Sequence, residues 1–431
     1  MTNFNLEGLY ELWIDKGYKY CTDTRKIETG ALFFALKGSN FNGNTYALKA
    51  LEQGCSYAIV DQEMASEDPR LIKVDDVLTC LQKLANHHRK QFDIPVIALT
   101  GSNGKTTSKE LIAACLSSRN VLATLGNLNN HLGVPFTLLR LRSHHELALI
   151  EMGANHQGEI SELCDIAEPD FGYITNFGKA HMEGFGGIEG IIKGKTELYR
   201  YLIAKGGSLF LNSADPIQYS YKDQTTSICF GIKPEDSPIE LVSANPLLKF
   251  LYQDKLYSTH LVGTYNFINI SAAICIASYF DIPVQNSIKA ITNYIPENNR
   301  SQLNKVEKAQ VVLDAYNANP SSMRVALESF FSQEQNRKVL ILGDMFELGA
   351  YSLEEHKNLI DYLRDKQFEK VILLGTHFNQ AYSLSQPLDN LESFQNKTEF
   401  THTEFYKSMF NRDHYILIKG SRGMKLEDLI P

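Results

Sequence analysis

The chain has 431 residues, and its 42 Lys plus Arg against 50 Asp plus Glu give a formal net charge of −8. That length predicts several domains, and we expect three. The mild acidity argues against a general nucleic-acid-binding protein, because phosphate backbones attract a surplus of basic residues. Hydrophobic residues make up 43% and charged residues 21%, which argues against disordered and fibrous classes.

Export and membrane insertion are not expected either. No apolar run approaches the roughly 18 residues that cross a bilayer, and the stretch MTNFNLEGLYEL lacks the basic-then-apolar order of a signal peptide. The seven cysteines are scattered and form no C-x-x-C pair. An odd, scattered set is typical of free thiols in a reducing compartment. We therefore predict a cytoplasmic protein without a disulfide frame or a zinc site.

The first region mixes short strand signals with helices. A β-prone run, Ala31–Leu36, follows a turn at Gly30, and Gly54 separates a helical stretch from a second buried strand. The segment VLTCLQKLANHHRKQF predicts an amphipathic helix. Asp93-Ile94-Pro95 then breaks the pattern, so we expect residues 1–93 to form a small α/β domain.

The middle region alternates short apolar runs with helical stretches, which predicts βαβ units and a mainly parallel sheet. A polar, Pro-containing patch near Pro296–Ser301 marks a second boundary, so the central domain is expected at residues 94–298. The apolar runs are VIALT, LALIEMG, YITNFG, SLFLN and SICFG, and the helices include SKELIAACLSSR and NFINISAAICIASYF.

The last region, residues 299–431, repeats this alternation more plainly and predicts a Rossmann-like, doubly wound domain. Ligands of such folds bind beyond the carboxyl ends of the strands, where the sequence has Asp314, Asp344 and Lys419. The fold class is therefore α/β with three domains. The expected strands are VVLDAYN, KVLILGD, KVILLG and HYILIKG, and the helices are SSMRVALESFF, SLEEHKNLIDYLRDK and TEFYKSMF.

The segment VIALTGSNGKTTSKE predicts a phosphate-binding loop between a strand and a helix. Glycines let backbone N–H groups face an anion, the helix N-terminus adds positive potential, Lys105 pairs with phosphates and Thr106 can reach Mg²⁺. The loop departs from the longer G-x-x-x-x-G-K-[ST] pattern, because Leu99 stands where that pattern has its first glycine. The residues assigned to ATP binding here are Gly101, Ser102, Asn103, Gly104, Lys105, Thr106 and Thr107.

Three residues on the same central domain could complete a metal site. Glu151 ends an apolar strand, where it could hold Mg²⁺ or simply cap a helix or face solvent. His181 is either a metal ligand or a hydrogen-bonded structural residue. Lys195, taken alone, reads as an exposed helical lysine.

Polar loop residues leave further alternatives open. Asn127, Asn129 and Asn130 could bind a sugar, a peptide or a diphosphate, or could serve turn chemistry. Asn266 is either an N-cap or an adenine contact. Arg300 could stabilise a transferring phosphoryl group or be a solvated linker residue.

Together these segments resemble the Mur ligases, the ATP-dependent amide-bond synthetases of cytoplasmic peptidoglycan precursor assembly. The short T-G-x-N-G-K-T loop at Thr100–Thr106 has the form found in that family. The resemblance runs from Asp23-Thr24-Arg25 to KGSRGMKLEDLI and covers nearly the whole chain. Five segments look like the member that joins D-alanyl-D-alanine to a UDP-N-acetylmuramoyl-tripeptide: GNLNNHLGVPFTLL, EMGANHQGEI, NFGKAHMEGFGG, DAYNANPSSM and GDMFELG.

The resemblance implies a role for each candidate residue. The first domain would bind the UDP moiety, the second ATP with two magnesium ions, and the third would help to bind the dipeptide; we expect a monomer that serves cell-wall synthesis and cell division. Tyr265 departs from the histidine that related ligases often carry, which weakens the adenine contact at Asn266. The implied roles are uridine nucleotide for Thr24 and Arg25; muramoyl peptide for Asn127, Asn129 and Asn130; metal for Thr106, Glu151, His181 and a carbamylated Lys195; nucleotide for Asn266, Arg300 and Asp314; dipeptide for Tyr316 and Asn317; and catalysis for Lys105, Lys195 and His181.

Two other functions remain compatible with the motifs. One is another amide ligase with the same ATPase core, either a different Mur ligase or a folylpolyglutamate-type synthetase. The other is a nucleotide-binding switch or scaffold that performs no chemistry. The Asp23-Thr24-Arg25 and GDMFELG segments argue against the former, and the presence of Glu151, His181 and Lys195 beside a phosphate loop argues against the latter.

Overall fold

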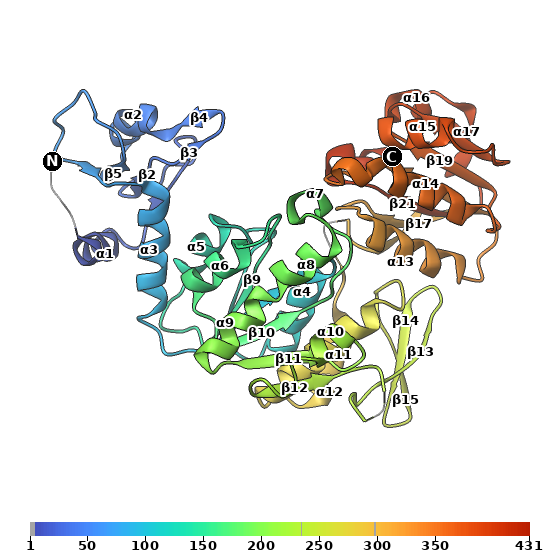
Figure 1. Ribbon diagram of the computed structural model, residues 1–431, viewed down its shortest axis with the longest axis horizontal. Helices are drawn as coiled ribbons and strands as arrows, with labels where there is room; N and C mark the ends of the chain where they lie inside the picture. The colour runs from blue at the N-terminus through green and yellow to red at the C-terminus, as the bar shows by residue number, and fades with distance from the viewer. Residues whose placement is uncertain (1–4, 234, 297–298) are drawn as a thin grey trace. The chain divides into compact units, whose positions relative to one another are not determined.

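The computed structural model describes residues 5–233, 235–296 and 299–431, so residues 297 and 298 of the predicted second boundary lie outside the described part. The chain forms two compact units. Unit 1 contains Met1–Ile97, Arg119–Met152 and Ser161–Asp170, and unit 2 contains Ala98–Ser118, Gly153–Ile160 and Phe171–Pro431. The fold is α/β with mainly parallel sheets, as predicted (Figure 1).

The N-terminal region contains a four-stranded parallel sheet with the order β1-β2-β5-β6. The predicted strand Ala31–Leu36 is shorter in the structure, but all six of its residues are buried. Its alternate side chains, Ala31, Phe33 and Ala35, pack in a core beneath α2. The elements are α1 (Leu6–Asp15), β1 (Tyr20–Cys21), β2 (Leu32–Phe34), β3 (Lys37–Gly38), β4 (Phe41–Asn42), α2 (Ala47–Glu52), β5 (Tyr57–Val60), β6 (Leu71–Lys73) and α3 (Val77–Arg89).

A buried histidine joins α3 to its neighbours. The Nε2 of His88 lies 3.0 Å from the carbonyl oxygen of Leu141, and Nδ1 lies 3.0 Å from the hydroxyl of Tyr10. Because a carbonyl oxygen only accepts, Nε2 carries the proton and Nδ1 accepts from the tyrosine. The ring also meets Trp13 edge-on, with centroids 4.8 Å apart. Burial lowers the pKa of His88 to about 4, so the ring is neutral in the folded protein.

This neutral ring is expected to make unit 1 sensitive to acid. His88 takes up a proton near pH 6.5 in the unfolded chain, but only near pH 4 in the folded chain. Its contribution to the free energy of unfolding is therefore complete above pH 6.5 and is lost as the pH falls toward 4. At pH 5 this loss lowers the free energy of unfolding by about 2 kcal/mol. Urea unfolding at pH 7.5 and pH 5, followed by the fluorescence of Trp13, the single tryptophan, will measure it. The difference between the free energies of unfolding at the two pH values should shrink in His88→Gln and persist in the exposed control His131→Gln.

The central sheet has six strands in the order β12-β11-β10-β7-β9-β8, and the β8–β9, β10–β11 and β11–β12 pairs are parallel. All five predicted apolar runs are strands. A three-stranded antiparallel sheet, β13-β14-β15, was not predicted. The strands are β7 (Val96–Thr100), β8 (Val121–Ala123), β9 (Leu147–Glu151), β10 (Phe171–Ile174), β11 (Ser208–Asn212), β12 (Ser227–Phe230), β13 (Glu240–Ala244), β14 (Leu248–Tyr252) and β15 (Lys255–Ser258).

Helices alternate with these strands, as the βαβ pattern requires. Both predicted helical stretches are present, as α4 and α11. The helices are α4 (Lys105–Cys115), α5 (Gly133–Leu138), α6 (Glu159–Ala167), α7 (Met182–Phe185), α8 (Ile188–Lys195), α9 (Glu197–Lys205), α10 (Pro216–Tyr219), α11 (Asn266–Tyr279) and α12 (Val284–Asn293). No helix in the described ranges is long and apolar enough to cross a membrane.

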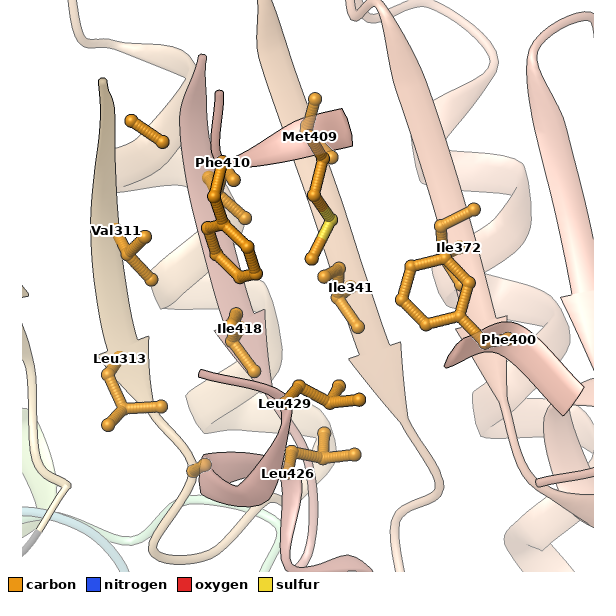
Figure 2. Close-up of a cluster of buried hydrophobic side chains, with 14 of the residues drawn as sticks. Val311, Leu313, Ile341, Ile372, Phe400, Met409, Phe410, Ile418, Leu426 and Leu429 are labelled. Atoms are coloured by element: carbon orange, nitrogen blue, oxygen red, sulfur yellow. The ribbon is translucent and has the colours of Figure 1, made fainter. Parts of the chain in front are cut away.

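The C-terminal sheet has the order β16-β17-β21-β18-β19-β20, and only β16 runs antiparallel to its neighbour. Alternate residues of four strands cover one face of this sheet, as Figure 2 shows for Val311, Leu313, Ile341, Ile372 and Ile418. The face is closed by Phe400, Met409, Phe410, Leu426 and Leu429. The strands are β16 (Gln302–Val306), β17 (Ala309–Asp314), β18 (Lys338–Gly343), β19 (Lys370–Leu374), β20 (Leu391–Phe394) and β21 (Tyr415–Lys419).

The helices of this region are α13 (Pro320–Phe331), α14 (Ser352–Leu363), α15 (Thr376–Ser383), α16 (Lys397–Thr401) and α17 (Glu404–Met409). Three of them, α13, α14 and α17, lie at the predicted stretches, whereas α15 and α16 were not predicted. Of the three polar residues predicted at strand ends, Asp344 has a structural role, because its carboxylate accepts the backbone N–H groups of His377 and Phe378 at the start of α15.

Candidate active site

The predicted phosphate loop connects β7 to α4 in unit 2. Gly104 has a φ of 80° and immediately precedes α4, which begins at Lys105. The first amides of this helix therefore have no preceding helical carbonyl to bind, and such a helix N-terminus is suited to binding an anion. Lys105 Nζ donates to the carbonyl oxygens of Gly101 (2.8 Å) and Ser102 (3.4 Å), so the ammonium lies over the loop.

The end of β10 holds this loop. The backbone N–H of Ser102 donates to the carbonyl of Asn176 (3.0 Å), and that of Asn103 donates to the Asn176 side chain (3.1 Å). The hydroxyl of Thr175 donates to the Asn103 carbonyl over 2.6 Å. Asn176 was not among the predicted site residues, although it is a polar residue just beyond the end of β10, within the run YITNFG, and so carries a signal like the one that singled out Glu151.

The loop offers oxygen donors of the kind that magnesium and phosphate chemistry uses. Thr106 is buried with a 4% exposed fraction. The hydroxyls of Thr100 and Ser102 are buried and have no hydrogen-bond partner within the described part of the chain. Among the described residues, no three His, Cys, Asp or Glu side chains converge as a metal cage. Mg²⁺ commonly takes one or two protein carboxylates and completes its shell with phosphate oxygens and water.

Lys195 ends α8 and is buried, with 1% of its surface exposed, so the interpretation as an exposed helical lysine is wrong. Its Nζ donates to the carbonyl of Ala154 (3.2 Å) and lies 4.9 Å from the centroid of the Phe185 ring. Burial, followed by the positive charge of Lys105, lowers the pKa of this amine well below its ordinary value. The surroundings of Lys195 therefore disfavour the charged ammonium form and favour the neutral amine.

His181 is the N-cap of α7 and has a left-handed backbone conformation with a φ of 53°. Its Nδ1 lies 2.5 Å from the Oε2 of Glu347, in the GDMFELG segment. The contact with His181 lowers the pKa of the Glu347 carboxyl below its usual value. A metal role for His181 stays a prediction. The metal would have to bind Nε2, because Nδ1 contacts Glu347.

In unit 1, Glu151 is 1% exposed at the end of β9, so a solvent-facing role is wrong. Its Oε1 accepts a hydrogen bond from the side chain of Asn129 over 2.7 Å, which joins two of the predicted site residues. Asn130 serves turn chemistry, since its side chain accepts from the N–H groups of Leu132 and Gly133 at the start of α5. Asn127 is exposed.

The predicted uridine-nucleotide residues lie after β1 in the same unit. Arg25 is exposed, and its guanidinium and backbone N–H both donate to Asp23, with the closest contact at 2.7 Å. This pairing lowers the pKa of Asp23 to about 2. The turn therefore presents an exposed guanidinium of the kind that binds phosphate.

Four of the predicted C-terminal residues make contacts near the end of β17. The carboxylate of Asp314 pairs with Lys419 at 2.5 Å and accepts the N–H of Ser301. The guanidinium of Arg300 lies 3.5 Å from the centroid of the Tyr316 ring. Arg300 is thus a half-buried residue in a cation–π contact rather than a solvated linker arginine. The carbonyl of Asn317, which follows Tyr316, accepts from Lys419 (3.4 Å).

Asn266 is the first residue of α11 and not its N-cap, which is Tyr265, so that alternative is wrong. Its side chain donates to the carbonyl of Val262 (2.8 Å) and accepts from Asn269 (3.0 Å), whose own side chain accepts from Ser108 on α4. The Tyr265 hydroxyl pairs with Ser301 at 2.7 Å. A nucleotide contact at Asn266 stays a prediction.

Three family models match successive parts of this chain: the Mur ligase family, catalytic domain at residues 19–89, the Mur ligase middle domain at 99–277, and the Mur ligase, glutamate ligase domain at 299–422. A UDP-N-acetylmuramoyl-tripeptide–D-alanyl-D-alanine ligase of Bacillus subtilis is 32% identical over 95% of this chain and 91% of its own length. The chain belongs to the Mur ligase family. The prediction of an ATP-dependent ligase is thereby confirmed.

Other Mur ligases match over nearly the same length. The Escherichia coli protein with the same name as the Bacillus one is 31% identical over 95% of this chain and 92% of its own. Among solved structures, a crystal structure of MurF from Acinetobacter baumannii superimposes with a TM-score of 0.86 at 30% identity, covering 95% of this chain and 92% of that one. The predicted family and fold class are therefore correct, while the individual site residues and the domain boundaries remain predictions.

Proposed function

We propose that this Mur ligase joins D-alanyl-D-alanine to a UDP-N-acetylmuramoyl-tripeptide through an acyl-phosphate intermediate, with ATP as the phosphoryl donor. The substrates follow from similarity to relatives with that name over 95% of the chain. The observation that carries the chemistry is the presence, in one compact unit, of a phosphate loop with Lys105 and of a buried Lys195, whose pKa is lowered by burial and by the positive charge of Lys105.

The residues of the chain have separable tasks in this reaction. A carboxylate and an amine do not condense in water, so the tripeptide carboxylate must first accept the γ-phosphoryl group. The amides at the start of α4 and the ammonium of Lys105 would hold the phosphates and neutralise charge as that group moves. The neutral dipeptide amine then attacks the acyl phosphate, and inorganic phosphate leaves.

Magnesium is part of this proposal. Oxygen ligands would come from Thr106, Glu151 and a carbamylated Lys195, and a ring nitrogen of His181 is a fourth candidate ligand. The bound ions would neutralise phosphate charge. Carbamylation suits the setting of Lys195 because only a neutral amine attacks CO₂. The carbamate N–H can still donate to Ala154, and its negative charge would turn the repulsion by Lys105 into attraction.

Other predicted site residues would bind the two substrates. Arg25 and Thr24 would bind the uridine diphosphate, Asn129 the muramoyl peptide, and Tyr316 and Asn317 the dipeptide. The enzyme would act in the cytoplasm, where its nucleotide-linked substrate is made, and as a monomer. Residues 1–93, 94–298 and 299–431 would be the three domains.

A coupled assay tests this function directly. Purified protein should release phosphate from Mg-ATP only when both the UDP-muramoyl tripeptide and D-alanyl-D-alanine are present, and mass spectrometry should find the pentapeptide product. Equal turnover without the UDP-linked acceptor would contradict the proposal. Glutamate, L-alanine and diaminopimelate in place of the dipeptide test the alternative ligases, and tight ATP binding without any amide product would indicate a switch.

A further inference from the structure

The tip of the phosphate loop contacts a residue from the C-terminal region of the same compact unit. The side-chain Nδ2 of Asn319 lies 2.6 Å from the Oδ1 of Asn103. Asn319 is the N-cap of α13 and is 6% exposed. The two residues are 216 positions apart in the chain, so only the tertiary structure brings them together.

The capping box of α13 fixes which atom of Asn319 faces the loop. The Oδ1 of Asn319 accepts the backbone N–H of Ser322 (2.9 Å), while the Ser322 hydroxyl accepts the N–H of Asn319 (3.0 Å). Because a backbone N–H can only donate, the bonded atom of Asn319 must be its oxygen. The side-chain nitrogen of Asn319 is therefore the donor to Asn103, and the side-chain oxygen of Asn103 is the acceptor.

A glycine makes the approach possible. A Cβ on Gly178 would lie 2.6 Å from the Nδ2 of Asn103 and 3.0 Å from the Cβ of Ser321, the second residue of α13. The next residue, Lys179, donates its N–H to the Ser321 hydroxyl over 2.8 Å. The Nζ of Lys179 also lies 2.6 Å from the Glu355 carboxylate on α14. Three hydrogen bonds, two of them from Lys179, thus join α13 and α14 to the phosphate loop and to the segment after β10.

Together with this contact, hydrogen bonds hold both the backbone and the side chain of Asn103. Its N–H donates to Asn176, and its carbonyl accepts from Thr175 (2.6 Å) and from Asn176 (3.0 Å). Asn319 binds the side chain of Asn103. A loop held on every side before the nucleotide arrives loses less conformational entropy on binding, which raises affinity.

We infer that Asn319 is a positioning residue that fixes Asn103, and with it the phosphate loop, for binding ATP. It acts through Asn103 and does not itself touch the nucleotide. This inference rests on the proposed role of the loop in ATP binding. By thermodynamic linkage, ATP binding in turn favours the contact between α13 and the loop.

The variant Asn319→Ser tests the inference because serine is also a good N-cap but is too short to reach Asn103. We expect a roughly three- to tenfold rise in the Kd for a non-hydrolysable ATP analogue with Mg²⁺, the size expected for one lost neutral hydrogen bond. The KM for ATP should rise with it, whereas the KM for D-alanyl-D-alanine should not. Titration calorimetry gives the first value and the coupled assay the other two.

Two further variants separate positioning from helix capping. Ser322→Ala removes the reciprocal half of the capping box but leaves the Asn319 amide facing Asn103, so its ATP affinity should match the wild type. Asn103→Ala removes the partner, and the double variant Asn103→Ala/Asn319→Ser should be no weaker than Asn103→Ala alone.

An unchanged Kd in folded Asn319→Ser, an equal rise in Ser322→Ala, or additive effects in the double variant would each overturn the inference. The calorimetric Kd does not depend on ligation. A wild type that binds ATP but makes no product would therefore refute the proposed function and leave this inference standing.

Discussion

Replacing Lys195 by alanine is expected to abolish ligation while leaving the fold intact. If Lys195 carries a carbamate that holds Mg²⁺ at the transferring phosphate, its loss should lower kcat by about a thousandfold or more. Removing this side chain, whose Nζ donates to the carbonyl of Ala154, should affect the unfolding midpoint far less than it affects kcat. Short carboxylic acids such as formate or acetate should restore part of the activity, because they can occupy the space of the lost carbamate.

The matched control for this variant is Lys193→Ala. Lys193 is exposed on the same helix, two residues earlier, and should keep nearly full activity. Labelling the wild type with ¹³C-bicarbonate should also give a carbamate carbon signal in NMR spectra that Lys195→Ala lacks. Full activity of Lys195→Ala without added acid would show that Lys195 has no such role, and activity without the NMR signal in the wild type would exclude the modification.

Gly101→Ala is expected to be the most damaging change in the phosphate loop. Gly101 has a φ of +139°, and an added Cβ would lie 1.9 Å from the Thr175 hydroxyl oxygen and 2.9 Å from the Thr175 backbone nitrogen. That nitrogen donates to the carbonyl of Thr100 (2.9 Å), so the backbone cannot move away without breaking this bond. Strain and overpacking should together destabilise the protein by about 2–5 kcal/mol.

The displaced loop should also lose ATP affinity by about a hundredfold, since small shifts in a binding loop have large effects. Gly206→Ala is the control: its φ is +74°, but nothing lies within 4 Å of the added Cβ. It should cost only about 1–2 kcal/mol for the left-handed conformation and leave ATP binding unchanged. If the two variants lose equal stability and both keep wild-type affinity, the close approach of Thr175 does not constrain the loop.

Local sequence patterns determined most of the architecture of this protein. Strand–helix alternation gave the parallel sheets, because buried parallel strands are short apolar runs separated by amphipathic helices. The strand VIALT followed by Gly101 and Gly104 correctly predicted a tight loop between a strand and a helix, since such a loop is encoded within one stretch of chain. The antiparallel strands β13–β15 were missed, because they are half-exposed and lack long apolar runs.

The environment of single residues was decided only by the tertiary structure. Lys195 looks like a surface lysine in GIIKGKTELY, and its burial results from its packing against Phe185 and Ala154. Asn103 and Asn319 carry no sign of each other in the sequence, because a contact across 216 residues depends on how strands and helices pack. Sequence periodicity records which face of an element is apolar, but the partner of a polar side chain is set by elements distant in the chain.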